Sequence, residues 1–169
     1  MTLKRFPFAL TTLSIILGVF IAILFGVNED LFKSRIKEGL SKNVKILSIE
    51  DTAKKEATIN SEAEKNWRYY QRFHFHATGI SAMTLGLLLM ISFLNAPQKL
   101  KIAASLLTSV GGFLYPFVWL FAGIYGPEMG RSEAKEAFAI FGYMGGVFLL
   151  GTLLSFYMSL RYDFVKRTD

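Results

Sequence analysis

Two histidines lie two residues apart in the stretch RYYQRFHFHATG, which runs from Arg68 to Gly79 and joins a charged segment to a long apolar one. They are the only histidines in the sequence, and an imidazole can bind a haem iron, a zinc ion or a copper ion. His74 and His76 are therefore the first candidates for chemistry. Because residues two apart in a helix project about 200° from each other, we expect the two rings to face different neighbours.

Three interpretations of the pair stay open, and the first is purely structural. A histidine near a membrane boundary needs only one hydrogen-bond partner, which water, backbone or a tyrosine can supply. The second is a redox site, because an imidazole can ligate a b-type haem and Gly79 would leave room for the macrocycle. Met83, Tyr115 or a second copy of the chain would supply the other ligand. The same side chains, with Trp119, would also suit a quinone headgroup.

The third interpretation is a copper or zinc site at the outer face of the membrane. His74 and His76 would be joined by Glu128 and Met129 of the turn GPEMG, which the expected topology brings to the same side. Nitrogen with a thioether suits Cu(I), and nitrogen with a carboxylate suits Zn(II). The sequence contains no cysteine, which excludes disulfides, thiolate metal sites, prenylation and palmitoylation.

Long apolar runs must position these residues. Hydrophobic residues make up 52% of the 169, the mean hydropathy is +0.37, and four windows lack Asp, Glu, Lys and Arg altogether. These windows are Phe8–Val27, Phe73–Leu94, Ile102–Tyr125 and Ala137–Leu160. A helix of about 20 residues crosses a hydrocarbon core of about 30 Å. The sequence therefore predicts an all-α integral membrane protein, a bundle of four transmembrane helices with an extracytoplasmic segment over 28–72.

The basic residues predict the orientation of the bundle. Positive charge is enriched in the chain ends and in the connection between the second and third windows, namely at Lys4, Arg5, Lys99, Lys101, Arg161, Lys166 and Arg167. Cytoplasmic connections carry such an excess, so we expect both termini in the cytoplasm, with the bacterial inner membrane as the default location. The first window is longer than a signal-peptide core and has no A-x-A cleavage pattern after it, so we expect a retained span.

The 28–72 segment contains local signals of its own. Phe32, Ile36 and Leu40 at four-residue spacing predict an amphipathic helix that ends near Gly39. Lys45–Ile49 could form a short strand. The pattern SEAE at Ser61–Glu64 is typical of a capping box and predicts that the helix of the second span begins there.

Prolines and small residues predict how the later spans bend and pack. Pro116 should kink the third span, and Tyr125-Gly-Pro127 should end it. Small residues at four-residue spacing allow helices to approach closely in lipid. Such residues are Ala104, Thr108 and Gly112 in the third span, and Gly142, Gly146, Gly151, Ser155 and Ser159 in the fourth.

Several functional classes are excluded by what the spans lack. No ionisable carboxylate, lysine or arginine lies in the windows, so a proton relay has no carrier. No HExxH, GxSxG or P-loop pattern occurs, and an enzyme acting alone is not expected. The net charge is +6, but the sequence contains no recognisable nucleic-acid-binding module, so the charge does not indicate binding to nucleic acid. We therefore expect a non-catalytic accessory or assembly subunit that contacts lipid and either other membrane subunits or a second copy. The alternative is a redox subunit with haem b, copper or quinone at His74 or His76.

Overall fold

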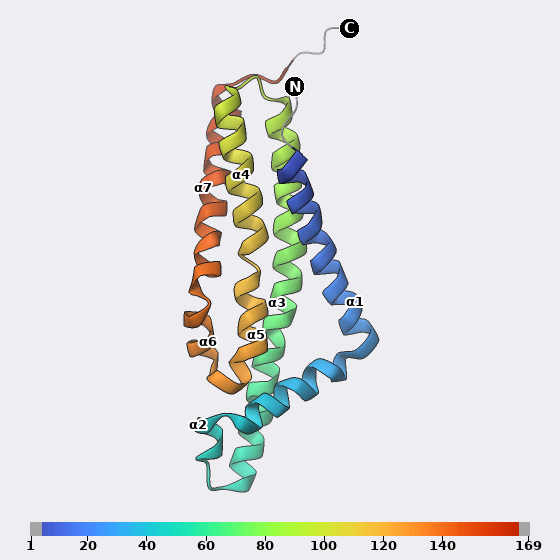
Figure 1. The fold of residues 1–169 in the computed structure, drawn as a ribbon, viewed down its shortest axis with the longest axis vertical. Coiled ribbons are helices and arrows are strands. Elements are labelled where there is room, and N and C mark those ends of the chain that lie inside the picture. The colour runs from blue at the N-terminus through green and yellow to red at the C-terminus, as the bar shows by residue number, and fades with distance from the viewer. Residues whose placement is uncertain (1–4, 166–169) are drawn as a thin grey trace.

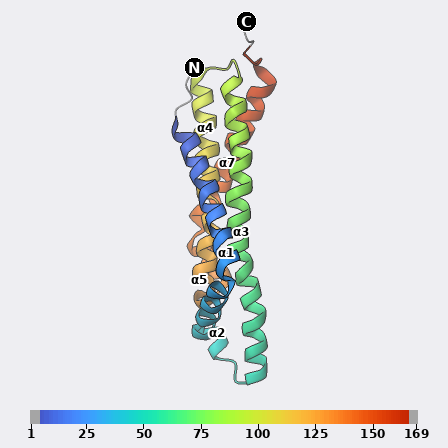
Figure 2. The same cartoon turned by 90° about the vertical axis from the view of Figure 1, so that its right-hand side faces the viewer.

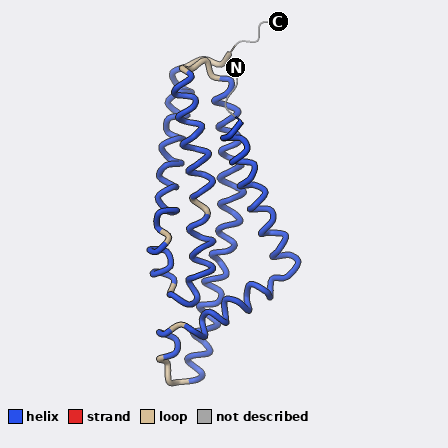
Figure 3. Tube along the Cα trace, in the orientation of Figure 1, coloured by secondary structure: helices blue, strands red, loops and turns tan. Residues whose placement is uncertain are grey.

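The computed structural model describes residues 5–165, and its named elements are all helices (Figure 3). In chain order they are α1 Arg5–Lys42, α2 Val44–Leu47, α3 Thr52–Phe93, α4 Gln98–Leu114, α5 Phe117–Met129, α6 Arg131–Ala137 and α7 Ala139–Arg161. An antiparallel bridge joins Leu94 to Phe164. Lys4, Lys166 and Arg167 of the orientation prediction lie outside the described residues.

Four helical units are long and apolar enough to cross a membrane. They are α1, α3, the α4–α5 pair and α7, and each contains a strongly apolar stretch of 18 residues. The sequence prediction of an all-helical chain with four candidate spans is therefore confirmed.

Helix α3 runs along most of the length of the molecule (Figures 1 and 2). Helix α1 packs mainly against α3, and α7 packs mainly against α4, so these two helices flank opposite sides of the bundle (Figure 1). The start of α1 and the end of α7 lie at one end of the bundle. The 28–72 segment gathers at the other end, where the second half of α1 crosses beneath the bundle to reach α2 (Figure 1).

Small residues set the spacing of the packed helices. The sequence prediction is correct for some of these residues and wrong for others. Gly151 lies against α4, where a Cβ at this position would be 2.7 Å from the backbone nitrogen of Thr108. Ala104, Thr108 and Ser155 are fully buried in the same interface. Gly142 and Gly146 do not belong to it, because a Cβ at Gly146 would meet nothing within 4 Å and one at Gly142 would meet only Val118. Within this chain the prediction of close packing at these two glycines is wrong.

The first span and the predicted amphipathic helix form one element, α1, interrupted at Asn28. Asn28 has extended backbone angles (φ −155°, ψ 78°). The prediction of a helix with Ile36 and Leu40 on its inner face is confirmed, since both are buried, although the helix ends at Lys42 rather than near Gly39.

The strand expected over Lys45–Ile49 is wrong, because Val44–Leu47 forms the short helix α2. The side chain of Asn43 accepts a hydrogen bond from the backbone of Lys45 and so caps this turn. Ile46 packs into a cluster with Ile36 and Leu40. The helical turn therefore buries its apolar residue without a partner strand.

Helix α3 begins nine residues before the predicted capping box. Asp51 is the N-cap, and its side chain accepts a hydrogen bond from the backbone nitrogen of Lys54 at 3.0 Å. Ser61 and Glu64 lie inside the helix. The prediction of a start at Ser61 is wrong because residues 52–61 contain no glycine or proline, and the earlier cap already satisfies the first turn.

The third span is broken at Pro116, as predicted. Helix α4 ends at Leu114 and α5 begins at Phe117, and Pro116 is almost completely buried between them. Pro127 does not end α5, which continues to Met129, so that prediction is wrong. The helix ends at Gly130, whose φ of +102° lies in a region that side chains rarely adopt.

Candidate functional site

His74 joins helices α3 and α1. Its Nδ1 atom lies 2.8 Å from the backbone oxygen of Gly18 in α1. Because the carbonyl oxygen only accepts, Nδ1 carries the proton in this bond. The two backbones are close here, since a Cβ at Gly18 would lie 2.7 Å from the methyl group of Thr78. His74 therefore takes part in the packing of α1 on α3.

His76 points to a different neighbour, as its two-residue offset from His74 predicts. Its Nδ1 lies 2.7 Å from the backbone oxygen of Arg72 in the same helix. Its ring lies 5.4 Å from the ring of Tyr115 and 5.8 Å from that of Trp119, measured between centroids. The imidazole therefore lies beside the Pro116 break, where α4 passes into α5.

Aromatic rings in contact continue from His76 along the interface of α3 and α5. We call Tyr69, His76, Tyr115 and Trp119 the aromatic column. Tyr69 stacks on Trp119 with centroids 5.8 Å apart, and the guanidinium of Arg72 lies 4.9 Å from the Trp119 ring. The Trp119 indole nitrogen is buried and has no hydrogen-bond partner within residues 5–165. A buried N–H beside an imidazole could bind a carbonyl-type acceptor.

The structure therefore brings only some of the predicted cofactor-binding residues together. His76 and Tyr115 come together, whereas His74 belongs to the α1 interface. Gly79 is exposed on α3, and a Cβ there would meet nothing within 4 Å. The side chain of Met83 is also exposed. Neither residue helps to enclose the aromatic column.

The predicted metal set is not gathered either. Glu128 and Met129 are exposed at the end of α5, where the backbone oxygen of Glu128 accepts a hydrogen bond from the Asn43 amide at 3.0 Å. Among the residues that the structure describes, no three side chains of His, Cys, Asp and Glu could hold one metal ion. His74, His76 and Glu128 thus do not form such a group.

Polar contacts fasten the 28–72 segment to the rest of the chain. The Asn43 amide also donates to the backbone oxygen of Pro127 at 3.0 Å. Lys45 pairs with Glu133 of α6, and this hydrogen bond is the main reason that the pKa of Glu133 lies below its ordinary value. Arg131 lies 3.7 Å from Glu62 and also donates from Nε to the hydroxyl of Tyr69. These contacts hold the segment on the ends of α5 and α6.

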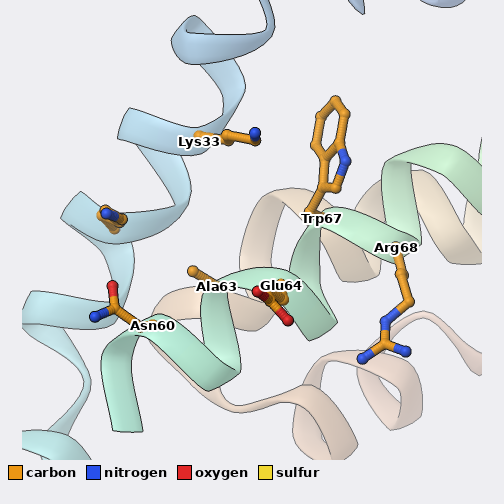
Figure 4. A pocket seen from close by; sticks show the side chains of 7 residues that line it. Lys33, Asn60, Ala63, Glu64, Trp67 and Arg68 are labelled. Atoms are coloured by element: carbon orange, nitrogen blue, oxygen red, sulfur yellow. The ribbon is translucent and has the colours of Figure 1, made fainter. Parts of the chain in front are cut away.

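A basic cleft lies between the second half of α1 and α3, and sequence reasoning did not identify it. Its volume is about 630 Å³, and its lining residues are Lys33, Lys37, Asn60, Ala63, Glu64, Trp67 and Arg68. Figure 4 shows Lys33 extending from α1 toward the side of Trp67, with Asn60 and Glu64 on the facing helix. The sequence contains one signal for this cleft. Lys33 and Lys37 lie four residues apart, and each directly follows an apolar residue of the amphipathic helix, Phe32 or Ile36.

Known proteins give no further guide to this chain. No protein-family model matches it, and neither a curated protein nor a solved structure does so.

Proposed function

We propose that this chain is a multi-pass membrane protein that acts as a non-catalytic assembly subunit, with α7 of one copy packing against α7 of a second copy. The proposal includes an extracytoplasmic 28–72 segment, cytoplasmic chain ends and the bacterial inner membrane as location. The observation that carries it is Gly146 of the GxxxG motif Gly142–Gly146: within residues 5–165, a Cβ at Gly146 would meet nothing within 4 Å, and one at Gly142 would meet only Val118 at 3.9 Å.

Two properties of α7 favour this partner. It is the least covered of the four candidate spans, with only 11% of its apolar stretch buried. Its uncovered face contains no charge between Ala139 and Leu160. A GxxxG face is complementary to a copy of itself, because two backbones can approach where neither helix has a side chain.

The internal polar groups support a structural rather than a catalytic role. His74 bonds to Gly18, and the Ser14 hydroxyl donates to the backbone oxygen of Ala77 at 3.3 Å. The hydroxyls of Thr84, Thr108 and Ser155 donate to carbonyls of their own helices. These polar side chains are thus engaged in hydrogen bonds within the bundle, which supports a structural role for them.

A single cysteine tests the proposal directly, because the natural sequence contains none. Gly146→Cys should form a disulfide-linked dimer when membranes containing the full-length protein are oxidised. Gly79→Cys is the matched control, since Gly79 is also an exposed helical glycine with open space at its Cβ position. It should remain monomeric on gel electrophoresis.

A second pair of variants separates association from folding. Gly146→Leu should reduce dimer formation without lowering thermal stability in detergent, because the added side chain points away from the chain. Gly151→Leu should lower stability, because its side chain would collide with the backbone of α4. A Gly146→Cys protein that cross-links no better than Gly79→Cys would overturn the proposed self-association. Cross-links to a different membrane protein would instead identify a heteromeric assembly.

The buried Trp119 nitrogen favours a second candidate, a redox subunit. A quinone, a haem b or a copper ion would bind beside His76, with Tyr115 and Trp119 forming the walls. The test is a reduced-minus-oxidised absorption spectrum with metal and quinone analysis of the purified protein. A bound group that is lost in His76→Ala and retained in His74→Ala would support this candidate, and a colourless protein without metal or quinone would exclude it.

A further inference from the structure

The basic cleft combines three cations with one carboxylate. Lys33 and Lys37 line it from α1, and Arg68 and Glu64 line it from α3. Lys33 also lies 3.1 Å from Glu29, but no carboxylate of residues 5–165 lies within ion-pair distance of Lys37 or Arg68. The cleft therefore favours an anion.

The cleft adjoins the end of the first apolar window. The ring of Trp67 packs edge-on against Phe25, which belongs to that window, with centroids 4.8 Å apart. Trp67 also precedes the second window by six residues, or about 9 Å along a helix. Tryptophan prefers this depth, where an apolar ring meets polar headgroups. The anion that reaches the cleft most readily is therefore part of the membrane itself.

We infer that the basic cleft binds the phosphate headgroup of an anionic phospholipid. Lys33, Lys37 and Arg68 would contact the phosphate. Asn60 and Glu64 provide acceptors for hydroxyl groups of the headgroup. The volume of about 630 Å³ falls in the range of small-molecule sites, and Trp67 would adjoin the upper part of the acyl chains. This inference rests on the membrane insertion included in the proposed function. It concerns a different face of the molecule from α7 and does not depend on the proposed self-association.

Lipid retention by the delipidated full-length protein tests the inference. Native mass spectrometry would count bound phosphatidylglycerol against phosphatidylethanolamine, which has the same phosphate but no net charge. We expect preferential retention of phosphatidylglycerol. Replacing Lys33, Lys37 and Arg68 by Gln should lower its affinity more than about tenfold, because each such charge contributes roughly fivefold near an anionic headgroup.

The control variant removes three positive charges from positions outside the cleft, in the 28–72 segment and α6. Lys54, Lys55 and Lys135 do not line the cleft, and their replacement by Gln should leave the preference unchanged. Equal retention of the two lipids by the natural protein, or an unchanged preference in the cleft variant, would overturn the inference. Displacement of phosphatidylglycerol by millimolar inorganic phosphate would also overturn it, by identifying a soluble phosphate as the ligand.

A fluorescence measurement tests whether the retained lipid occupies the cleft. The chain has two tryptophans, so Trp119→Phe leaves Trp67 as the single indole. Phosphatidylglycerol should shift the emission of Trp67 to shorter wavelength, and phosphatidylethanolamine should not. An emission unchanged by a lipid that is nevertheless retained would place that lipid elsewhere and contradict the inference.

Discussion

Lys101 shows how one side chain can be misjudged from sequence. Its position suggested a free cytoplasmic charge, but the residue is only 1% exposed. Its ammonium donates to the backbone oxygens of Ser92 and Leu94, at 3.0 and 2.9 Å. The last carbonyls of a helix lack partners within the helix, and they attract a cation because of the helix dipole. Lys101 therefore caps the C-terminus of α3.

Lys101→Met should destabilise the protein by about 2 kcal/mol, because the substitution keeps most of the apolar part of the side chain but leaves two buried carbonyls without a donor. Lys99→Met is the matched control, since Lys99 is exposed two residues away. Thermal denaturation in detergent measures both. Equal transition temperatures for the two variants would contradict the capping role.

At the scale of the element, Asn28 divides α1 into a span and a crossing helix. Its Oδ1 atom accepts a hydrogen bond from the backbone nitrogen of Leu31 at 3.0 Å, as an N-cap does. This cap starts a new helix direction, and the following residues pass beneath the bundle (Figure 1). The basic cleft depends on this direction, because Lys33 and Lys37 reach α3 only through the crossing helix.

Asn28→Ala should weaken the crossing helix by about 1 kcal/mol, since it removes the side-chain acceptor. Asn28→Asp keeps an acceptor and adds a charge that the helix N-terminus favours, so it should preserve stability. Hydrogen exchange of amides 31–42 is the measurement, and Asn28→Ala should speed it about fivefold. Equal exchange in the two variants would show that the bend does not rest on this cap.

The sequence predicted the elements where a single strong signal controlled them. The four apolar windows and the break at Pro116 needed no information from distant residues. The start of α3 was mispredicted because Asp51 and Ser61 are both competent caps, and only the first has its backbone partner in the structure. The turn at Val44–Leu47 depends on burial of Ile46 against residues of α1, which short-range patterns do not contain.

The candidate sites show the same limit. Helical geometry sufficed to predict that His74 and His76 face different neighbours. It did not reveal which neighbours, because Gly18 and Tyr115 approach them only in the folded bundle. The basic cleft joins lysines and α3 residues more than twenty positions apart in the chain. Such a site exists only once α1 bends at Asn28.

At the scale of the whole molecule, the arrangement of charge leads to a prediction of orientation. Arg5, Lys99 and Arg161 lie in the segments at the end where α1 starts and α7 ends, with Asp163 as the acidic residue among their neighbours (Figure 1). At the opposite end, the short connection over 126–136 contains two basic residues, Arg131 and Lys135. An excess of basic residues in short connections and chain ends favours the cytoplasmic side of a membrane, and long segments count for little. The 28–72 segment should therefore face outward.

Single cysteines measure this orientation without disturbing any charge. Ser48 and Gln98 are both neutral and exposed, and they lie at opposite ends of the molecule. In intact bacterial cells expressing each variant, a membrane-impermeant maleimide should label Ser48→Cys and should reach Gln98→Cys only after permeabilisation. The reverse pattern would invert the topology, and it would then place the lipid cleft in the cytoplasmic leaflet. Labelling of both cysteines in intact cells would show that the apolar helices do not cross the membrane as spans.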